Sequence, residues 1–267
     1  AAFDPTIKDQ LVQQSKLEAD FTALLASAKF DFQGESLTLS EIRKYAEHPD
    51  RTGRQDAERL RWGWFEDHQG ELDQLFNDLV GLRRQMAEQL GYESFIDLGY
   101  LLMQRTDYDR HDVARFRDEV QKHIVPLCTQ LRQQQARSLG INPLMAWDEA
   151  LHDTAGNPKP HGDHDWMIAQ AQRMFAEMGG GLDEFFAAMR AANLMDLKSR
   201  EGKAGGGFCD GLPVLGMPFI YANFNGTKGD VEVFTHEMGH AFQNYSSRNA
   251  TLSDYFWPTC EACEIHS

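Results

Sequence analysis

The chain has 267 residues, of which 42% are hydrophobic, and a formal net charge of −15. This length permits one large domain or two small ones, with enough apolar side chains for a sizeable core. The acidic balance argues against nucleic acid or anionic membranes as partners, because nothing offsets repulsion from phosphate groups. No apolar run reaches the roughly 18 residues of a membrane span. Four cysteines are too few for a disulfide scaffold, which favours a reducing cytoplasm.

The sequence pattern in the first part of the chain predicts a series of consecutive helices. A broad apolar stripe indicates a helix over residues 5–29, and residues 40–47 form a shorter helix with Ser40 as its N-cap. A single long helix is expected over residues 54–90, because its apolar positions repeat at intervals of three and four. Gly91 is expected to end it.

The next helix is expected to begin at Asp112 and to kink at Pro126, which cannot donate a backbone hydrogen bond. Its apolar stripe should face the core, and His123 beside that stripe is interpreted as a core or rim histidine rather than a ligand. The stripe consists of Val113, Phe116, Val120, Ile124, Leu127 and Leu131. Residues 141–163 hold several prolines, glycines and aspartates and predict a surface loop.

The end of this loop carries a cluster of histidines and aspartates, His161-Gly162-Asp163-His164-Asp165. Such a cluster can bind a metal, but Asp163 is also a natural N-cap for a helix over residues 165–178, and the cap is the favoured interpretation. Another helix is predicted over residues 182–193, after three glycines.

The pattern then changes to strands. Residues 203–208 and 214–224 predict two β segments around a turn at 210–213. Gly205, Gly206 and Gly207 permit a close backbone approach or unusual backbone angles. Two interpretations stay open from the residues alone: a tight turn or hinge, and an edge strand on which an extended peptide can add by main-chain hydrogen bonds.

The pentapeptide at 236–240 matches H-E-x-x-H, a pattern typical of zinc peptidase helices. His236 and His240 lie four residues apart, so one helix face presents both to a single metal ion. Glu237 can then act as a base on water without being a ligand. Asp230 is expected to cap this helix, and Gly239 indicates that another segment approaches its backbone closely.

A zinc site needs a third protein ligand, and the candidates follow the pentapeptide. They are Asp254, Glu261, Glu264 and His266, with Cys260 and Cys263 between them. On a helix that starts after Pro258, Glu261 and Glu264 share roughly one face, so spacing does not choose between them. The pair Cys260 and Cys263 is interpreted as packing cysteines, because no second C-x-x-C accompanies it.

Several spaced motifs agree with one known family. They are Gly205-Gly206-Gly207-Phe208-Cys209, Pro218-Phe219, Asn223-Phe224-Asn225-Gly226-Thr227, Asp230-Val231 and the twelve residues from His236 to Ser247. Together they resemble oligoendopeptidase F and its relatives, zinc peptidases that also include thimet oligopeptidase. The resemblance implies a mainly α fold, a multi-helix lobe with a small β-sheet before the H-E-x-x-H helix. We expect a helical region at 1–195 and the first part of the zinc-binding catalytic region at 196–267.

The resemblance also implies a function and a site. The family's third ligand begins a motif that Glu264-Ile265-His266-Ser267 fits, so Glu264 is the expected ligand and Glu261 the fallback. The expected activity is a zinc-dependent endopeptidase acting on short unstructured peptides, with one Zn²⁺, a metal-held water as nucleophile and Glu237 as general base. Gly205, Gly206, Gly207 and Phe208 are expected to bind substrate.

Family members are about twice as long, and the groups that stabilise their oxyanion would lie beyond residue 267. The chain is therefore expected to be an internal portion of a longer peptidase, and the remainder of that peptidase is a possible partner. The alternative is a catalytically incomplete fragment, or a helical scaffold or binding protein that keeps a metal-binding helix.

Overall fold

The computed structural model describes residues 4–267 and is mainly helical, as predicted. Its helices are α1 (Lys8–Ala26), α2 (Arg51–Asp67), α3 (Gln69–Gln89), α4 (Phe95–Leu102), α5 (Arg110–Glu119), α6 (Val125–Leu139), α7 (His164–Met178), α8 (Leu182–Ala191), α9 (Lys228–Ser247) and α10 (Cys260–Cys263). Its strands are β1 (Lys29–Phe32), β2 (Glu35–Thr38), β3 (Met195–Lys198), β4 (Phe208–Leu212) and β5 (Met217–Phe224). Short 3₁₀ turns are η1 (Pro5–Ile7), η2 (Ile42–Glu47), η4 (Ala146–Asp148) and η5 (Ser253–Tyr255), and η3 (Val120–Ile124) is a π-helical segment.

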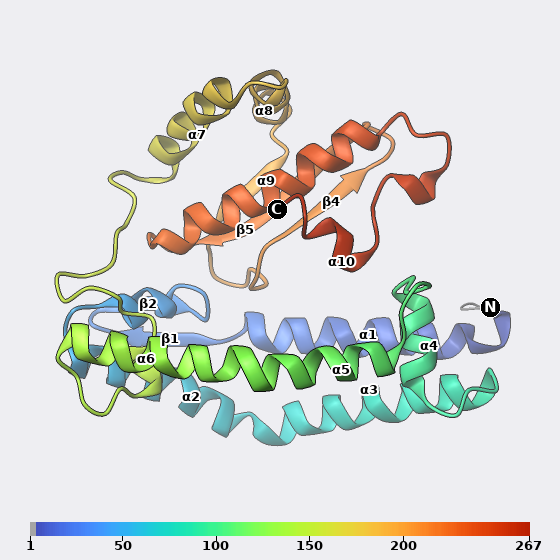
Figure 1. Ribbon diagram of the computed structural model, residues 1–267, viewed down its shortest axis with the longest axis horizontal. Coiled ribbons are helices and arrows are strands. Elements are labelled where there is room, and N and C mark those ends of the chain that lie inside the picture. The colour runs from blue at the N-terminus through green and yellow to red at the C-terminus, as the bar shows by residue number, and fades with distance from the viewer. Residues whose placement is uncertain (1–3) are drawn as a thin grey trace.

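The long helices α1, α3 and α5 lie along the same axis in one half of the molecule (Figure 1). Helix α1 packs against α3, and Gln10 donates to Gln89 across the pair at 2.6 Å. Gly91 ends α3 as predicted: its φ is +79°, and the N–H of Tyr92 donates to the carbonyl of Ala87. This is the pattern of a Schellman C-cap, which needs a left-handed residue at Gly91.

The predicted single helix over 54–90 is wrong, because the chain breaks at His68 into α2 and α3. The break lies between two glycines, Gly63 and Gly70, which have low helix propensity. The ring of His68 stacks on Trp64, with centroids 4.2 Å apart, and its Nδ1 lies 2.8 Å from the Trp64 carbonyl oxygen. These contacts fix the bend between the two helices.

The expectation of helices only in the first part of the chain is also wrong at residues 29–38, where β1 and β2 form an antiparallel hairpin. Gln33 and Gly34 form its turn with positive φ angles of +50° and +84°, the combination that tight two-residue hairpins require. Ser40 does not cap the following turn, because η2 starts at Ile42 and has no side-chain cap.

Helix α5 begins at Arg110, two residues earlier than predicted, because Asp109 caps it and Asp112 completes a capping box. Before Pro126 the helix widens into the π segment η3, an accommodation typical of a residue that lacks an N–H and crowds the preceding turn. The apolar stripe predicted to face the core is exposed: Phe116 keeps 70% of its surface accessible. His123 also lies at the surface, 3.1 Å from Glu119.

The other half of the molecule contains a three-stranded sheet in the order β3-β5-β4. Strand β5 pairs parallel with β3 and antiparallel with β4. The strand predicted at 214–224 is present as β5, but the strand predicted at 203–208 shares only Phe208 with β4. The turn predicted at 210–213 is wrong, because residues 210–212 pair with β5 as part of β4, and β3 was not predicted. Residues 203–207 are not a strand as expected, because Lys203 turns its ammonium inward to the carbonyl oxygens of Ala222, Lys198 and Asp196.

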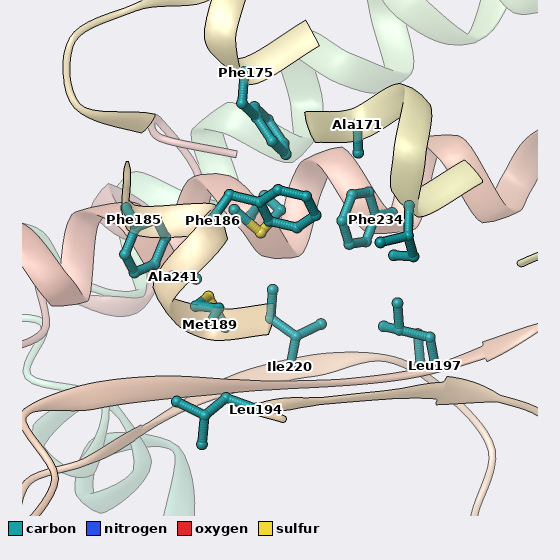
Figure 2. Packing of buried hydrophobic residues seen from close by; sticks show 13 residues of the cluster. Ala171, Phe175, Phe185, Phe186, Met189, Leu194, Leu197, Ile220, Phe234 and Ala241 are labelled. Atoms are coloured by element: carbon teal, nitrogen blue, oxygen red, sulfur yellow. The ribbon is translucent and has the colours of Figure 1, made fainter. Parts of the chain in front are cut away.

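One hydrophobic core joins this sheet to α7, α8 and α9. Figure 2 shows phenylalanines of the three helices gathered above Ile220 of β5 and Leu197 of β3. The buried residues of this core are Ile168, Ala171, Phe175, Phe185, Phe186, Met189, Leu194, Leu197, Ile220, Ala222, Phe234, Met238 and Ala241. Helices α7 and α8 therefore share a core with elements after residue 195, and the division at that residue stays a prediction.

Residues 141–163 connect α6 to α7 and contain η4; most of them lie at the surface, as predicted, but Asp148 and Leu151 are buried. The two halves of the molecule also meet through specific contacts. These are Lys29 with Glu201, Thr38 with Ser199, Asn225 with the carbonyl of Ser40, and Arg105 with Glu261. None of the helices within residues 4–267 is long and apolar enough to cross a bilayer.

Candidate metal centre

Helix α9 presents the H-E-x-x-H residues from the middle of a buried element. One face packs into the core through Phe234, Met238 and Ala241, a spacing of four and three that gives one helix face. The prediction that Asp230 is the N-cap is wrong. The helix starts at Lys228, and Asp230 sits within its first turn, accepting hydrogen bonds from the N–H groups of Asn225 and Gly226 at 2.9 and 2.7 Å.

The two histidines face each other across one helical turn. Their Nε2 atoms lie 3.1 Å apart, and their rings are nearly perpendicular. His240 is buried, whereas His236 is partly exposed. Burial lowers the pKa of His240 and outweighs the nearby carboxylate of Glu264, which raises it. The neutral imidazole, the form that ligates metals, is therefore favoured at His240.

Glu264 brings a carboxylate to the same point. Its Oε2 lies 3.4 Å from Nε2 of His236 and 3.7 Å from Nε2 of His240. The pKa of Glu264 is lowered: burial raises it, but hydrogen bonds from Ser267 and Cys263 and the two histidines together outweigh that effect. Glu261, the alternative candidate, points elsewhere and accepts from Nε of Arg105 at 2.8 Å.

These three donors suit a zinc ion in kind and in spacing. Two imidazole nitrogens and one carboxylate oxygen form a donor set found in zinc hydrolases. Ligand atoms about 2.0–2.2 Å from a tetrahedral zinc lie roughly 3.4 Å from one another. The observed separations of 3.1, 3.4 and 3.7 Å bracket that value. Within residues 4–267, no other group of three metal-ligating side chains converges in this way.

Gly239 explains how the third donor reaches the helix. The backbone of His266 and Ser267 crosses α9 so closely that a Cβ atom on Gly239 would lie 2.9 Å from Cα of Ser267. Real Cβ atoms almost never come this near to backbone. The close approach predicted at Gly239 is therefore present, and the crossing segment is the one that carries Glu264.

Glu237 lies beside the three donors and is 5% exposed. Burial raises the pKa of its carboxyl, the charge of His236 lowers it, and the carboxylate of Glu264 raises it further; the net direction is upward. Across from Glu237 is Gly207, where a Cβ atom would be 3.4 Å from Oε1 of Glu237. Cys209 on β4 is also close, and burial, assisted by Glu237, raises the pKa of its thiol to about 12.

The glycine segment 205–207 is held by two side chains of β5 to which the sequence assigned no role, although Asn223 belongs to one of the family motifs. Asn223 donates to the carbonyl oxygens of Ala204 and Gly206 at 2.8 and 2.9 Å, and the hydroxyl of Tyr221 donates to Ala204 at 2.7 Å. A signal was present in the sequence, since Tyr221 and Asn223 alternate on one face of a strand that follows the glycines. Beyond these residues, Phe208 begins β4 and stacks on Tyr221.

The other sequence candidates lie apart from this centre. Asp163 caps α7 as predicted, accepting from the N–H of Trp166 at 3.0 Å. Cys263 donates to the carbonyl of Cys260, and both cysteines are free thiols. Asp230 and Glu261 also make no hydrogen bond to the rings of His236 and His240 in the described residues. Their hydrogen bonds go instead to the loop before α9 and to Arg105.

A mainly helical fold, with a buried H-E-x-x-H helix packed on a small sheet and a carboxylate facing both histidines, defines a metallopeptidase-like protein. The sequence model described as peptidase family M3 matches residues 44–159 and 181–267. The chain belongs to this family.

Solved structures agree over the whole chain. A protein described as an oligoendopeptidase F is 44% identical with a TM-score of 0.98, and Pz peptidase A with an inhibitor is 43% identical with a TM-score of 0.98. A protein of the oligoendopeptidase F type from Bacillus anthracis is 42% identical with a TM-score of 0.97. Each match covers 100% of this chain but 47%, 47% and 49% of the relative, respectively. The chain thus spans about half the length of these relatives. No curated protein matches it.

Proposed function

We propose that this chain carries the zinc-binding and general-base residues of an endopeptidase that hydrolyses short unstructured peptides. The observation behind the proposal is the convergence of His236, His240 and Glu264, with the buried carboxylate of Glu237 beside them. Membership of peptidase family M3 supports peptide hydrolysis as the reaction.

In this proposal His236, His240 and Glu264 hold one zinc ion. A bound zinc ion supplies Lewis acidity that polarises the scissile carbonyl group and activates water. Glu237 accepts a proton from the attacking water and later transfers it to the leaving amine. Its upward-shifted pKa suits both steps, because an acid–base group works best when its pKa is near the working pH.

The substrate is proposed to lie along β4 and the glycine segment before it, in contact with Gly205, Gly206, Gly207 and Phe208. Strand β4 is the outer strand of its sheet and pairs only with β5 among the described residues. A peptide that adds to such an edge must be extended, which favours unstructured substrates over folded ones. The backbone of Gly207 lies close to Val233 and Glu237, and Gly206 and Gly207 line a hollow of about 420 Å³.

An incomplete fragment or a helical scaffold remains the alternative, because the chain spans about half the length of its solved relatives. The remainder of the same peptidase is a proposed partner of the chain. The proposed location is the cytoplasm, where four free thiols are stable. We also retain the proposed division into a helical region, 1–195, and a zinc-binding region, 196–267.

The test combines zinc content with cleavage of a quenched fluorescent peptide. We expect one zinc per chain and cleavage that a chelator abolishes. Glu237→Gln should keep the zinc and lower turnover by at least about 100-fold, the usual loss when a general base is removed. Glu93→Gln, at an exposed position, is the matched control and should behave as wild type.

Zinc content and cleavage together distinguish an active peptidase from an incomplete fragment or scaffold. Zinc binding without cleavage by the wild-type chain would favour the incomplete fragment or scaffold. Cleavage retained by Glu237→Gln, in a preparation free of wild-type enzyme, would contradict the assigned base.

A further inference from the structure

Helix α10, which presents Glu264, has little packing to hold it. It is a single turn from Cys260 to Cys263, with Glu264 at its C-cap, and none of its residues is buried. Its neighbours along the chain are fixed on both sides. Asn244 donates to the carbonyl of Phe256 before it, and the backbone of His266 lies against Gly239 after it. Burial therefore does not fix the rotation of the turn itself.

Helix α10 is held in place by a contact with Arg105, which lies in the other half of the molecule. Nε of Arg105 donates to Oε1 of Glu261 at 2.8 Å, and Nη2 of Arg105 donates to the same oxygen. Arg105 follows α4, which lies next to α10 in Figure 1. Its guanidinium group also lies over two rings, 4.7 Å from the centroid of Tyr100 and 5.7 Å from that of Tyr108. Cation–π contacts of this kind restrict where the guanidinium can move.

The geometry of one helical turn links this contact to the metal centre. Glu261 and Glu264 are three residues apart, so a single helical turn fixes the directions of their side chains relative to each other. Holding the carboxylate of Glu261 against Arg105 therefore sets the direction in which Glu264 points. In the observed orientation, Oε2 of Glu264 lies 3.4 Å from His236 and 3.7 Å from His240.

We propose that Arg105 is a positioning residue: through Glu261 it orients α10 so that Glu264 completes the metal centre. This inference rests on the proposed zinc function. The contact between Arg105 and Glu261 spans 156 positions of the sequence, so it couples the helical half of the molecule to the proposed zinc site. Side-chain contacts behind metal ligands commonly set metal affinity in this way.

If Arg105 and Glu261 only stabilised the fold, their loss would lower the stability of the metal-free protein. The side chains of Arg105 and Glu261 remain 20% and 45% exposed, and ion pairs of this exposure contribute little to fold stability. Loss of the pair should therefore leave unfolding of the metal-free protein nearly unchanged while it weakens zinc binding.

The experiment measures zinc affinity by competition with a chromophoric chelator, together with thermal unfolding of the metal-free chain. Arg105→Ala and Glu261→Ala should each weaken zinc binding about 10–100-fold, and the double variant should be no weaker than either. Arg105→Lys should recover only part of the affinity, because an ammonium lacks the planar donors and stacking of a guanidinium. Arg84→Ala removes an exposed ion pair within α3, that with Glu88, and should bind zinc as wild type does.

The outcomes separate the two proposals. Zinc binding by Arg105→Ala and Glu261→Ala equal to that of Arg84→Ala would overturn this inference alone. If the losses of zinc affinity in the two single variants multiplied in the double variant, this inference would also be overturned, since Arg105 and Glu261 would then act independently. A wild-type chain that binds no zinc would overturn the proposed function and this inference with it. If Arg105→Ala fails to fold, Glu261→Ala decides the question, because it leaves Arg105 on its two rings.

Discussion

Gly239 is the residue at which the segment carrying Glu264 crosses the H-E-x-x-H helix. A Cβ atom there would lie 2.8 Å from the carbonyl carbon of His266 and 2.9 Å from Cα of Ser267. Since both neighbours are backbone, Gly239→Ala must push the crossing segment away, and Glu264 moves with it. We expect zinc affinity to fall by at least about tenfold, as when a contact behind a metal ligand is lost. Competition titration against a chelator measures this.

Gly81 in α3 provides the matched control, because a Cβ atom there meets nothing within 4 Å. Gly81→Ala should stabilise the helix by up to about 1 kcal/mol and leave zinc affinity unchanged. If both alanine variants bind zinc as tightly as wild type, the crossing segment does not depend on Gly239.

The sequence predicted the relative positions of residues where the repeat of an α-helix determines which side chains share a face. The spacing of His236 and His240 places both on one helix face, and the structure brings their nitrogens together. The same period could not choose between Glu261 and Glu264, because both lie on one face of a single turn. What separates their orientations is Arg105, which no local pattern connects to them.

At the scale of elements, α9 is held in place by aromatic packing against α7 and α8. Phe186 is fully buried, and its ring lies 5.0 Å from that of Phe175 and 5.9 Å from that of Phe234 (Figure 2). Phe186→Ala should lower the free energy of unfolding by about 3–5 kcal/mol, because it removes apolar contacts and leaves a cavity. Urea unfolding at neutral pH measures the change.

Phe76 on α3 is the control, with 68% of its surface exposed. Phe76→Ala should change the unfolding free energy by no more than about 0.5 kcal/mol. Equal losses in the two variants would mean that the α7–α8–α9 core does not carry the stability assigned to it.

Elements with a strong helical period were predictable, whereas those set by a few special residues were not. The hairpin of β1 and β2 depends on left-handed angles at Gln33 and Gly34, and a Gln-Gly pair is a weaker hairpin signal than Asn-Gly. The expected strand at 203–207 was lost to the inward ammonium of Lys203. The apolar stripe of α5 and α6 correctly indicated an amphipathic helix, but such a pattern does not say which surface covers it.

At the scale of the whole molecule, long-range polar contacts join parts of the chain that periodicity treats separately. Asp148, in the connection between α6 and α7, is fully buried and accepts from Arg54 at 2.7 Å and from Arg51 at 2.8 Å. Arg54 is itself 1% exposed. These contacts fasten the connection to α2. Sequence reasoning predicted a surface loop here and had no means of finding its anchor, since the partners lie 94 and 97 residues away.

Asp148→Asn should lower the free energy of unfolding by about 3–5 kcal/mol at pH 7, because it leaves the guanidinium of Arg54 buried without its counter-charge. Asp56→Asn is the control. The pair of Asp56 with Arg59 is exposed and should contribute no more than about 1 kcal/mol. Urea unfolding of the three proteins at several pH values measures both effects.

The pH dependence follows from the pKa of Asp148. Burial raises that pKa, but hydrogen bonds from Arg51 and Arg54 outweigh burial and hold it below its ordinary value. A carboxyl with a lowered pKa in the folded state contributes stability above its unfolded pKa, about 3.9, and loses it as the pH falls through the folded value. The difference in free energy of unfolding between wild type and Asp148→Asn should therefore be equally large at pH 7 and pH 5, and it should decrease only below about pH 4. A gap that already closes between pH 7 and 5 would show that Asp148 is not held ionised by the two arginines.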